Sequence, residues 1–212
     1  MDLSPLDWCL VAFLIFLGGI VQTTLGFGLA VVASPFLIMI DPELVPGPAL
    51  SFGLVSALIT LWWNRAALAL RELTLAFVAR VPGTLLALPL VAFAPAALLA
   101  VLLGSAVLIA VAVSVRAPRI ERTRTVIVAA GFMSGLMGTA TSIGGPPMAL
   151  AYQSASGPTV RANLAAYMSV GMVTSLLALA LIGRFGLEQL QAAVWMVVPV
   201  VDEAERRVGA IK

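Results

Sequence analysis

Two long apolar segments of this chain are each interrupted near the middle by glycine, threonine and serine residues. They cover Phe16–Pro35 and Phe132–Ala151, and when laid over each other without gaps they match at Phe16/Phe132, Gly19/Gly135, Thr23/Thr139, Gly28/Gly144 and Ala33/Ala149. The interruption is strongest in Thr139–Pro147, which contains two glycines that disfavour a helix and two prolines that lack an N–H donor. A continuous helix is not expected there.

Interrupted apolar segments are costly in a membrane, because every backbone polar group in hydrocarbon must find a partner within the protein. Broken helices therefore survive only where protein or a wet cavity surrounds them, and paired breaks in two halves of a chain are typical of transporter binding sites. The alternative is that the small residues only let helices pack closely, as the pair Gly131 and Gly135 could do.

Composition assigns the chain to a membrane. Of its 212 residues, 61% are hydrophobic and 10% are charged, whereas soluble domains carry about 25% charged residues. The basic residues lie in short loops beside apolar segments, so nucleic-acid binding is not expected. The chain has no histidine and one cysteine, Cys9, which excludes disulfides and Cys/His metal sites. We expect no cofactor, and the lipid bilayer is the expected partner; assembly into a homo-oligomer is left open.

The sequence predicts an all-α polytopic protein with about seven hydrophobic segments in two repeats. Each repeat is expected to open with a broken helix or a re-entrant hairpin. The expected segments are Trp8–Ile40, Ala49–Trp63, Leu73–Phe93, Ala96–Val115, Val126–Tyr152, Ala162–Ile182 and Leu187–Val201. Repeats whose broken segments cross fully would be parallel, and repeats that open with hairpins would be inverted.

Charge and repeat boundaries divide the chain into four parts. We expect a first repeat over residues 1–115, a basic loop over 116–125, an incomplete second repeat over 126–201, and a polar tail over 202–212. The positive-inside rule places the basic loop in the cytoplasm. The first repeat has the equivalent of four spans, whereas the second is expected to lack its last one.

Hydrogen-bond donors at the two breaks are the candidate binding groups. A small oxyanion needs donors more than a full countercharge, because a strongly paired anion would not be released. The candidate side chains are Gln22, Thr23, Thr24, Thr139, Thr141 and Ser142, and the glycines that would admit a ligand to the backbone are Gly26, Gly28, Gly144 and Gly145. Each hydroxyl could instead bond to a carbonyl of its own helix.

Arg80 is the one basic residue expected inside a span, and a charge at that depth indicates a functional site unless the side chain snorkels to the interface. No acidic residue lies near the middle of an expected span, so a carboxylate proton relay is not visible. The membrane potential could drive anion export instead, and backbone carbonyls at the breaks could bind sodium.

These residues resemble a known family. The stretch Gly18–Gly28, with Pro35 after it, and the stretch Gly131–Gly138, leading to Ile143–Pro147, are similar to the two signature repeats of the TauE/SafE family of sulfite-exporter-like permeases. The stretch Gly157–Arg161 is also similar to that family's pattern. The resemblance covers roughly residues 8–200. It implies a non-enzymatic carrier of small anions, such as sulfite or organosulfonates, in the bacterial inner membrane.

The sequence departs from that family pattern after Pro199, where an eighth span would normally follow. The alternative function is therefore an inactive or truncated permease remnant, or a membrane subunit that does not transport. A membrane-embedded enzyme is disfavoured, because the chain offers no histidine and no carboxylate in the middle of a span.

Overall fold

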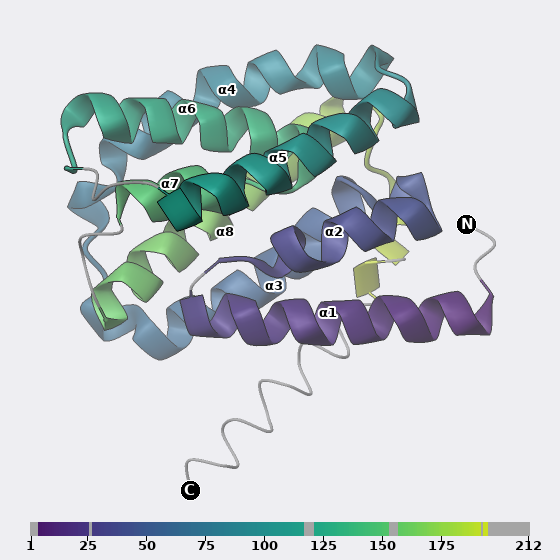
Figure 1. Cartoon of the computed structure of the whole chain (residues 1–212), viewed down its shortest axis with the longest axis horizontal. Coiled ribbons are helices and arrows are strands. Elements are labelled where there is room, and N and C mark those ends of the chain that lie inside the picture. The colour runs from purple at the N-terminus through teal and green to yellow at the C-terminus, as the bar shows by residue number, and fades with distance from the viewer. Residues whose placement is uncertain (1–3, 26, 117–120, 153–156, 192, 195–212) are drawn as a thin grey trace, which may run out of the picture.

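The computed structural model describes residues 4–25, 27–116, 121–152, 157–191 and 193–194. Every element in this part of the chain is helical (Figure 1). The long elements are α1 (Pro5–Leu25), α2 (Leu29–Ile40), α3 (Gly47–Asn64), α4 (Thr74–Phe93), α5 (Ala96–Arg116), α6 (Arg124–Thr141) and α8 (Pro158–Leu181), and the short helix α7 covers Gly145–Ala151. Three 3-10 turns, η1 (Pro42–Leu44), η2 (Arg65–Ala67) and η3 (Leu70–Glu72), connect them.

Four of the described helical stretches are long and apolar enough to cross a membrane. They are Pro5–Leu25, Pro42–Ala67, Thr74–Phe93 and Pro158–Leu181. A bilayer core requires about 20 apolar residues per helix, and the charged residues of these stretches lie near their ends, with the exception of Arg80 in α4. The chain is therefore a multi-pass membrane protein, as its composition predicts.

The first interrupted segment forms a hairpin of α1 and α2. Leu29, the first residue of α2, lies against Gly18 in the second half of α1, where a Cβ atom would come within 2.9 Å of the Leu29 carbonyl oxygen. At the turn, Gly28 has φ of 121°, a conformation that favours glycine. α2 consequently runs back along α1 (Figure 1).

The second interrupted segment folds back in the same way. α6 ends at Thr141, and Ser142 caps it in the left-handed conformation with φ of 66°. α7 then begins at Gly145, with prolines in its first turn. Pro146 and Pro147 thus begin the new helix, because a proline in the first turn gives up an N–H that would have no helical partner.

Two apolar clusters form the interior and meet at the second break. One contains buried side chains of α3, α4, α6, α7 and α8, including Tyr167 and Met148. The other contains residues of α1, α2, α3 and α5, together with Ile143 from the second break. The second break therefore lies at the centre of the molecule, between the two clusters.

Glycines bring α4 and α6 into backbone contact. A Cβ atom on Gly131 would lie 2.6 Å from the Ala76 carbonyl oxygen, and side chains at Gly83 or Gly135 would overlap the backbone of the facing helix. Gly131 and Gly135 thus serve close helix packing, which is the alternative interpretation of this pair. This packing fixes α4, and with it Arg80, beside the second break.

Candidate functional site

Arg80 is buried in the second turn of α4, with 4% of its surface exposed. Its Nη1 donates to Ser134 Oγ at 3.0 Å and lies 3.4 Å from the Ser134 carbonyl oxygen, and its Nη2 donates to Ser175 Oγ at 3.2 Å. The guanidinium carbon also lies 5.5 Å from the centre of the Tyr167 ring. α6 and α8 thus hold the arginine inside the protein, so the side chain does not snorkel to the interface.

The positive charge of Arg80 has no countercharge among the described side chains. The contacts of Arg80 are with hydroxyl, carbonyl and aromatic groups, and none is with a carboxylate. Its Nε–H has no hydrogen-bond partner in the described part of the chain. A buried charge is costly unless it is paired, so this site favours an anion.

A chain of hydroxyl groups extends from the arginine. The Thr139 and Ser175 hydroxyl oxygens are 2.7 Å apart, and Thr139 Oγ1 also donates to Thr84 Oγ1 at 3.3 Å. Ser134 Oγ, which accepts from Arg80, donates to the Gly144 carbonyl oxygen at the second break at 2.5 Å. We name this group the Arg80 cluster; it consists of Arg80, Thr84, Ser134, Thr139 and Ser175.

Two glycines make room for the guanidinium group. A Cβ atom on Gly171 of α8 would overlap its carbon and nitrogen atoms, and a Cβ atom on Gly138 of α6 would lie 3.1 Å from Nη2. The same position on Gly138 is 3.2 Å from the Cα atom of Gly144. Arg80 and the second break are therefore close neighbours.

Gln22 occupies the first break and is 1% exposed. Its Oε1 accepts a hydrogen bond from the Leu29 backbone N–H at 3.1 Å, which pairs one free donor of the α2 N-terminus. Its Nε2 has no partner in the described part of the chain. The two breaks touch, because a Cβ atom on Gly145 would lie 2.6 Å from the Phe27 ring.

The other predicted hydroxyls bond elsewhere. Thr23 donates to Gly19 and Ile20 carbonyl oxygens, Thr24 to the Ile20 oxygen, and Thr141 to the Met137 oxygen, each within its own helix. Ser142 donates to the Pro46 carbonyl oxygen at 3.0 Å. Of the predicted site residues, the structure therefore brings together Arg80, Thr139 and Gly144. Gln22, Gly28 and Gly145 lie nearby, where the two breaks touch. Gly26 lies outside the described residues.

Sequence reasoning missed three members of the cluster. Thr84 lies four residues after Arg80, the spacing that puts two side chains on one helix face, so it could have been found. Ser134 lies between Gly131 and Gly135 in α6, and nothing in that stretch distinguishes its hydroxyl from the small residues of a helix-packing surface. Ser175 is 95 positions from Arg80, and no local pattern marks it.

The model of the sulfite exporter TauE/SafE family matches residues 11–201, which is most of the chain. The chain belongs to the TauE/SafE sulfite exporter family. No curated protein and no solved structure matches the chain. Membership of the TauE/SafE family indicates that the chain is a membrane transporter. The matched residues include both breaks and the whole Arg80 cluster.

Proposed function

We propose that this TauE/SafE protein is a permease for small oxyanions, such as sulfite and organosulfonates, and that the anion binds at the Arg80 cluster. The observation that carries the proposal is a buried arginine whose described contacts include no carboxylate. Arginine presents five N–H donors in a planar fork that suits an oxyanion. The hydroxyls of Thr84, Thr139 and Ser175 can reorient to donate to the bound anion.

A surface pocket that hydrogen bonds connect to the second break supports this position for the site. A pocket of about 240 Å³ lies between the start of α3 and the end of α4, with Glu43, Pro46, Arg184 and Gln189 in its lining. Pro46 accepts the hydrogen bond of Ser142 at the second break, and Gly144 of the same break accepts from Ser134. These two hydrogen bonds connect the pocket lining through the second break to the Arg80 cluster.

The arrangement of α3 and α8 supports inverted repeats, each opening with a hairpin. These helices occupy corresponding positions after the two broken segments. They are antiparallel, because Gly53 faces Met172 while Gly47 faces Phe185. Transporters with inverted repeats place their substrate at the repeat interface, next to broken helices.

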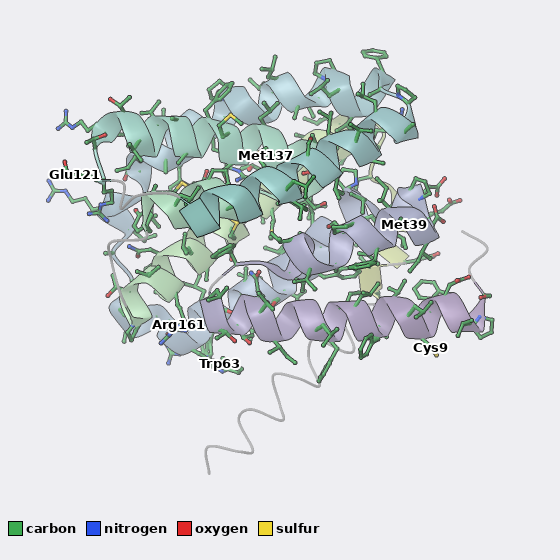
Figure 2. All side chains as sticks on the ribbon, in the orientation of Figure 1. Cys9, Met39, Trp63, Glu121, Met137 and Arg161 are labelled. Atoms are coloured by element: carbon green, nitrogen blue, oxygen red, sulfur yellow. The ribbon has the colours of Figure 1, made fainter. Side chains whose placement is uncertain are left out.

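The basic end of the molecule is proposed to face the cytoplasm of a bacterial inner membrane. The helix ends that carry Arg65, Arg124 and Arg161 gather at one end, where Figure 2 labels Arg161 and Glu121. The inside-negative potential, worth about 2.3 kcal/mol per charge per 100 mV, would then drive anions outward. A permease that works in this way needs no carboxylate relay.

Efflux from proteoliposomes tests the proposal. Labelled sulfite or a labelled small sulfonate is loaded, a membrane potential is imposed, and the native chain is compared with Arg80→Gln and with Arg65→Gln. Arg65 is an exposed arginine whose Nη1 donates to the Trp62 carbonyl oxygen, away from the cluster. We expect potential-dependent efflux that falls at least tenfold in Arg80→Gln, since a charged hydrogen bond is worth about 1.5–3 kcal/mol. In Arg65→Gln the efflux should change less than about twofold.

The proposal would be overturned if the native chain, folded and reconstituted, transported neither sulfite nor the sulfonate. It would favour the alternative that the protein is an inactive permease remnant or a membrane subunit that does not transport.

A further inference from the structure

The pocket between the start of α3 and the end of α4 has charged and amide side chains in its lining as well as apolar ones. We name it the Arg184 pocket. Its volume is about 240 Å³, and its charged and amide groups come from Glu43, Arg184 and Gln189. One water molecule takes about 30 Å³ in the liquid, so the pocket has room for a small oxyanion with part of its hydration water. Glu43 and Arg184 are exposed, and a hydrated ion can therefore reach the pocket from solvent.

Arg184 is held at this pocket by its backbone and by one end of its side chain. Gly183 follows the end of α8 in the left-handed conformation with φ of 72°, which glycine adopts at little cost. The Arg184 backbone N–H donates to the Leu179 carbonyl oxygen at 2.9 Å, a bond typical of this helix ending. Its Nη2 donates to the Ala92 carbonyl oxygen near the end of α4 at 2.6 Å. The guanidinium group is thus anchored between α4 and α8.

Both donor side chains of the pocket retain N–H groups without a protein partner in the described part of the chain. The hydrogen bond of the Arg184 side chain uses Nη2, which leaves the N–H groups of Nε and Nη1. Gln189 accepts the Gly186 N–H through Oε1 at 2.9 Å, which leaves its amide N–H groups. A guanidinium group with free donors complements an oxyanion, because charge-assisted hydrogen bonds are the stronger ones.

Glu43 limits how tightly such an anion can bind. Its carboxylate lines the same pocket, yet it forms no ion pair with Arg184 in the described part of the chain. It therefore does not neutralise the arginine directly, and it repels an anion that enters. Repulsion between charges in contact with water is modest. The pocket thus combines donors that attract an oxyanion with a charge that keeps its affinity low.

We infer that the Arg184 pocket is a second anion site, which holds a small, partly hydrated oxyanion beside the second break. The inference rests on the proposed function, to which it adds a second position for the anion. The pocket adjoins the break because Pro46 of its lining accepts the hydrogen bond of Ser142. In a permease the anion would move between Arg80 and Arg184 past this break, and low affinity at Arg184 suits its exchange with solvent.

Protection of an engineered cysteine tests the second site without measuring transport. In a Cys9→Ser background, Ala94→Cys places a thiol in the pocket lining, and Ala97→Cys places one at an exposed position of α5 outside that lining. The full chain in lipid nanodiscs is treated with N-ethylmaleimide, a neutral reagent. Sodium sulfate is titrated against sodium gluconate at constant ionic strength, because sulfite itself would react with the maleimide.

We expect saturating sulfate to slow the labelling of Ala94→Cys at least threefold, and that of Ala97→Cys hardly at all. Adding Arg184→Gln should raise the half-protecting sulfate concentration about tenfold, since a charged hydrogen bond is lost. Adding Glu43→Gln should lower it about two- to fivefold, since a repulsive charge is lost. Protection that is absent, equal at the two cysteines or unchanged by Arg184→Gln would overturn the second site.

This assay measures binding alone, so its outcome is separate from that of the efflux experiment. Sulfate protection that depends on Arg184 supports the second site even if the native chain carries no sulfite. Arg80-dependent efflux without such protection overturns the second site and leaves the permease proposal standing.

Discussion

At the scale of single residues, the account depends on how one arginine is held. Arg80 is the residue that the sequence identified as a charge inside a span, and the structure leaves it there, bonded to Ser134 and Ser175. Its depth could be predicted from its distance to the charged loops. Its partners could not, because they are 54 and 95 positions away and lie on helices whose packing no local pattern specifies.

Replacing Arg80 with lysine tests the geometry of the fork apart from its charge. Arg80→Lys keeps a positive charge but cannot bond two serines and an oxyanion in one plane. We expect the KM for sulfite to rise about tenfold in Arg80→Lys and to stay unchanged in Arg65→Lys, in proteoliposome efflux measured over a range of sulfite concentrations. Equal KM values for native chain and Arg80→Lys would show that only the charge matters.

Replacing Gly171 with alanine tests the space that the arginine occupies. The new Cβ atom would overlap the guanidinium group, and overpacking of this kind costs about 1–3 kcal/mol of stability. We expect a lower unfolding temperature together with reduced efflux. Gly104→Ala is the matched control, since a Cβ atom there meets nothing within 4 Å; it should be neutral or slightly stabilising. The same unfolding temperature for Gly171→Ala and the native chain would contradict the position of Arg80.

At the scale of helices, the two interruptions are the elements that position the site. Sequence predicted where they fall, because glycines and prolines disfavour a continuous helix at Thr139–Pro147. The sequence left open whether the helix after each break continues across the membrane or turns back. That direction depends on tertiary contacts, such as Leu29 against Gly18 and Phe27 against Gly145, which a pattern along one segment does not contain.

Gln22 is expected to stabilise the first hairpin. Gln22→Ala removes the acceptor for the buried Leu29 N–H, and leaving such a donor unsatisfied costs about 1–3 kcal/mol. The matched control is Gln189→Ala, which removes a similar bond to the Gly186 N–H at an exposed position, where water replaces the acceptor. Thermal unfolding should show a clear loss of stability only for Gln22→Ala, and equal losses would argue against the hairpin as described.

At the scale of the whole molecule, composition alone predicted a multi-pass helical membrane protein. What it did not show is that the second break sits between two apolar clusters, with Ile143 in one and Met148 in the other. That placement follows from the packing of helices far apart in the sequence. It explains why Thr139 belongs to the Arg80 cluster and Gly144 accepts a hydrogen bond from it, whereas Thr23 and Thr24 bond to carbonyls of their own helix.

Orientation in the membrane can be measured with engineered cysteines. In a Cys9→Ser background, Glu43→Cys and Glu121→Cys place one thiol at each end of the molecule, since both native side chains are exposed. A membrane-impermeant maleimide should label Glu43→Cys in intact cells and Glu121→Cys only after permeabilisation. The reverse pattern would place the basic end outside and overturn the proposed direction of anion flow.

The most direct test of the central claim is to locate a bound oxyanion in the protein itself. Selenite has the shape and charge of sulfite, and selenium is visible by anomalous scattering in crystals of the native chain. We predict an anomalous peak within hydrogen-bonding distance of the Arg80 guanidinium group that disappears in Arg80→Gln. A peak at the N-terminus of α2 beside Gln22, with none at Arg80, would contradict the account.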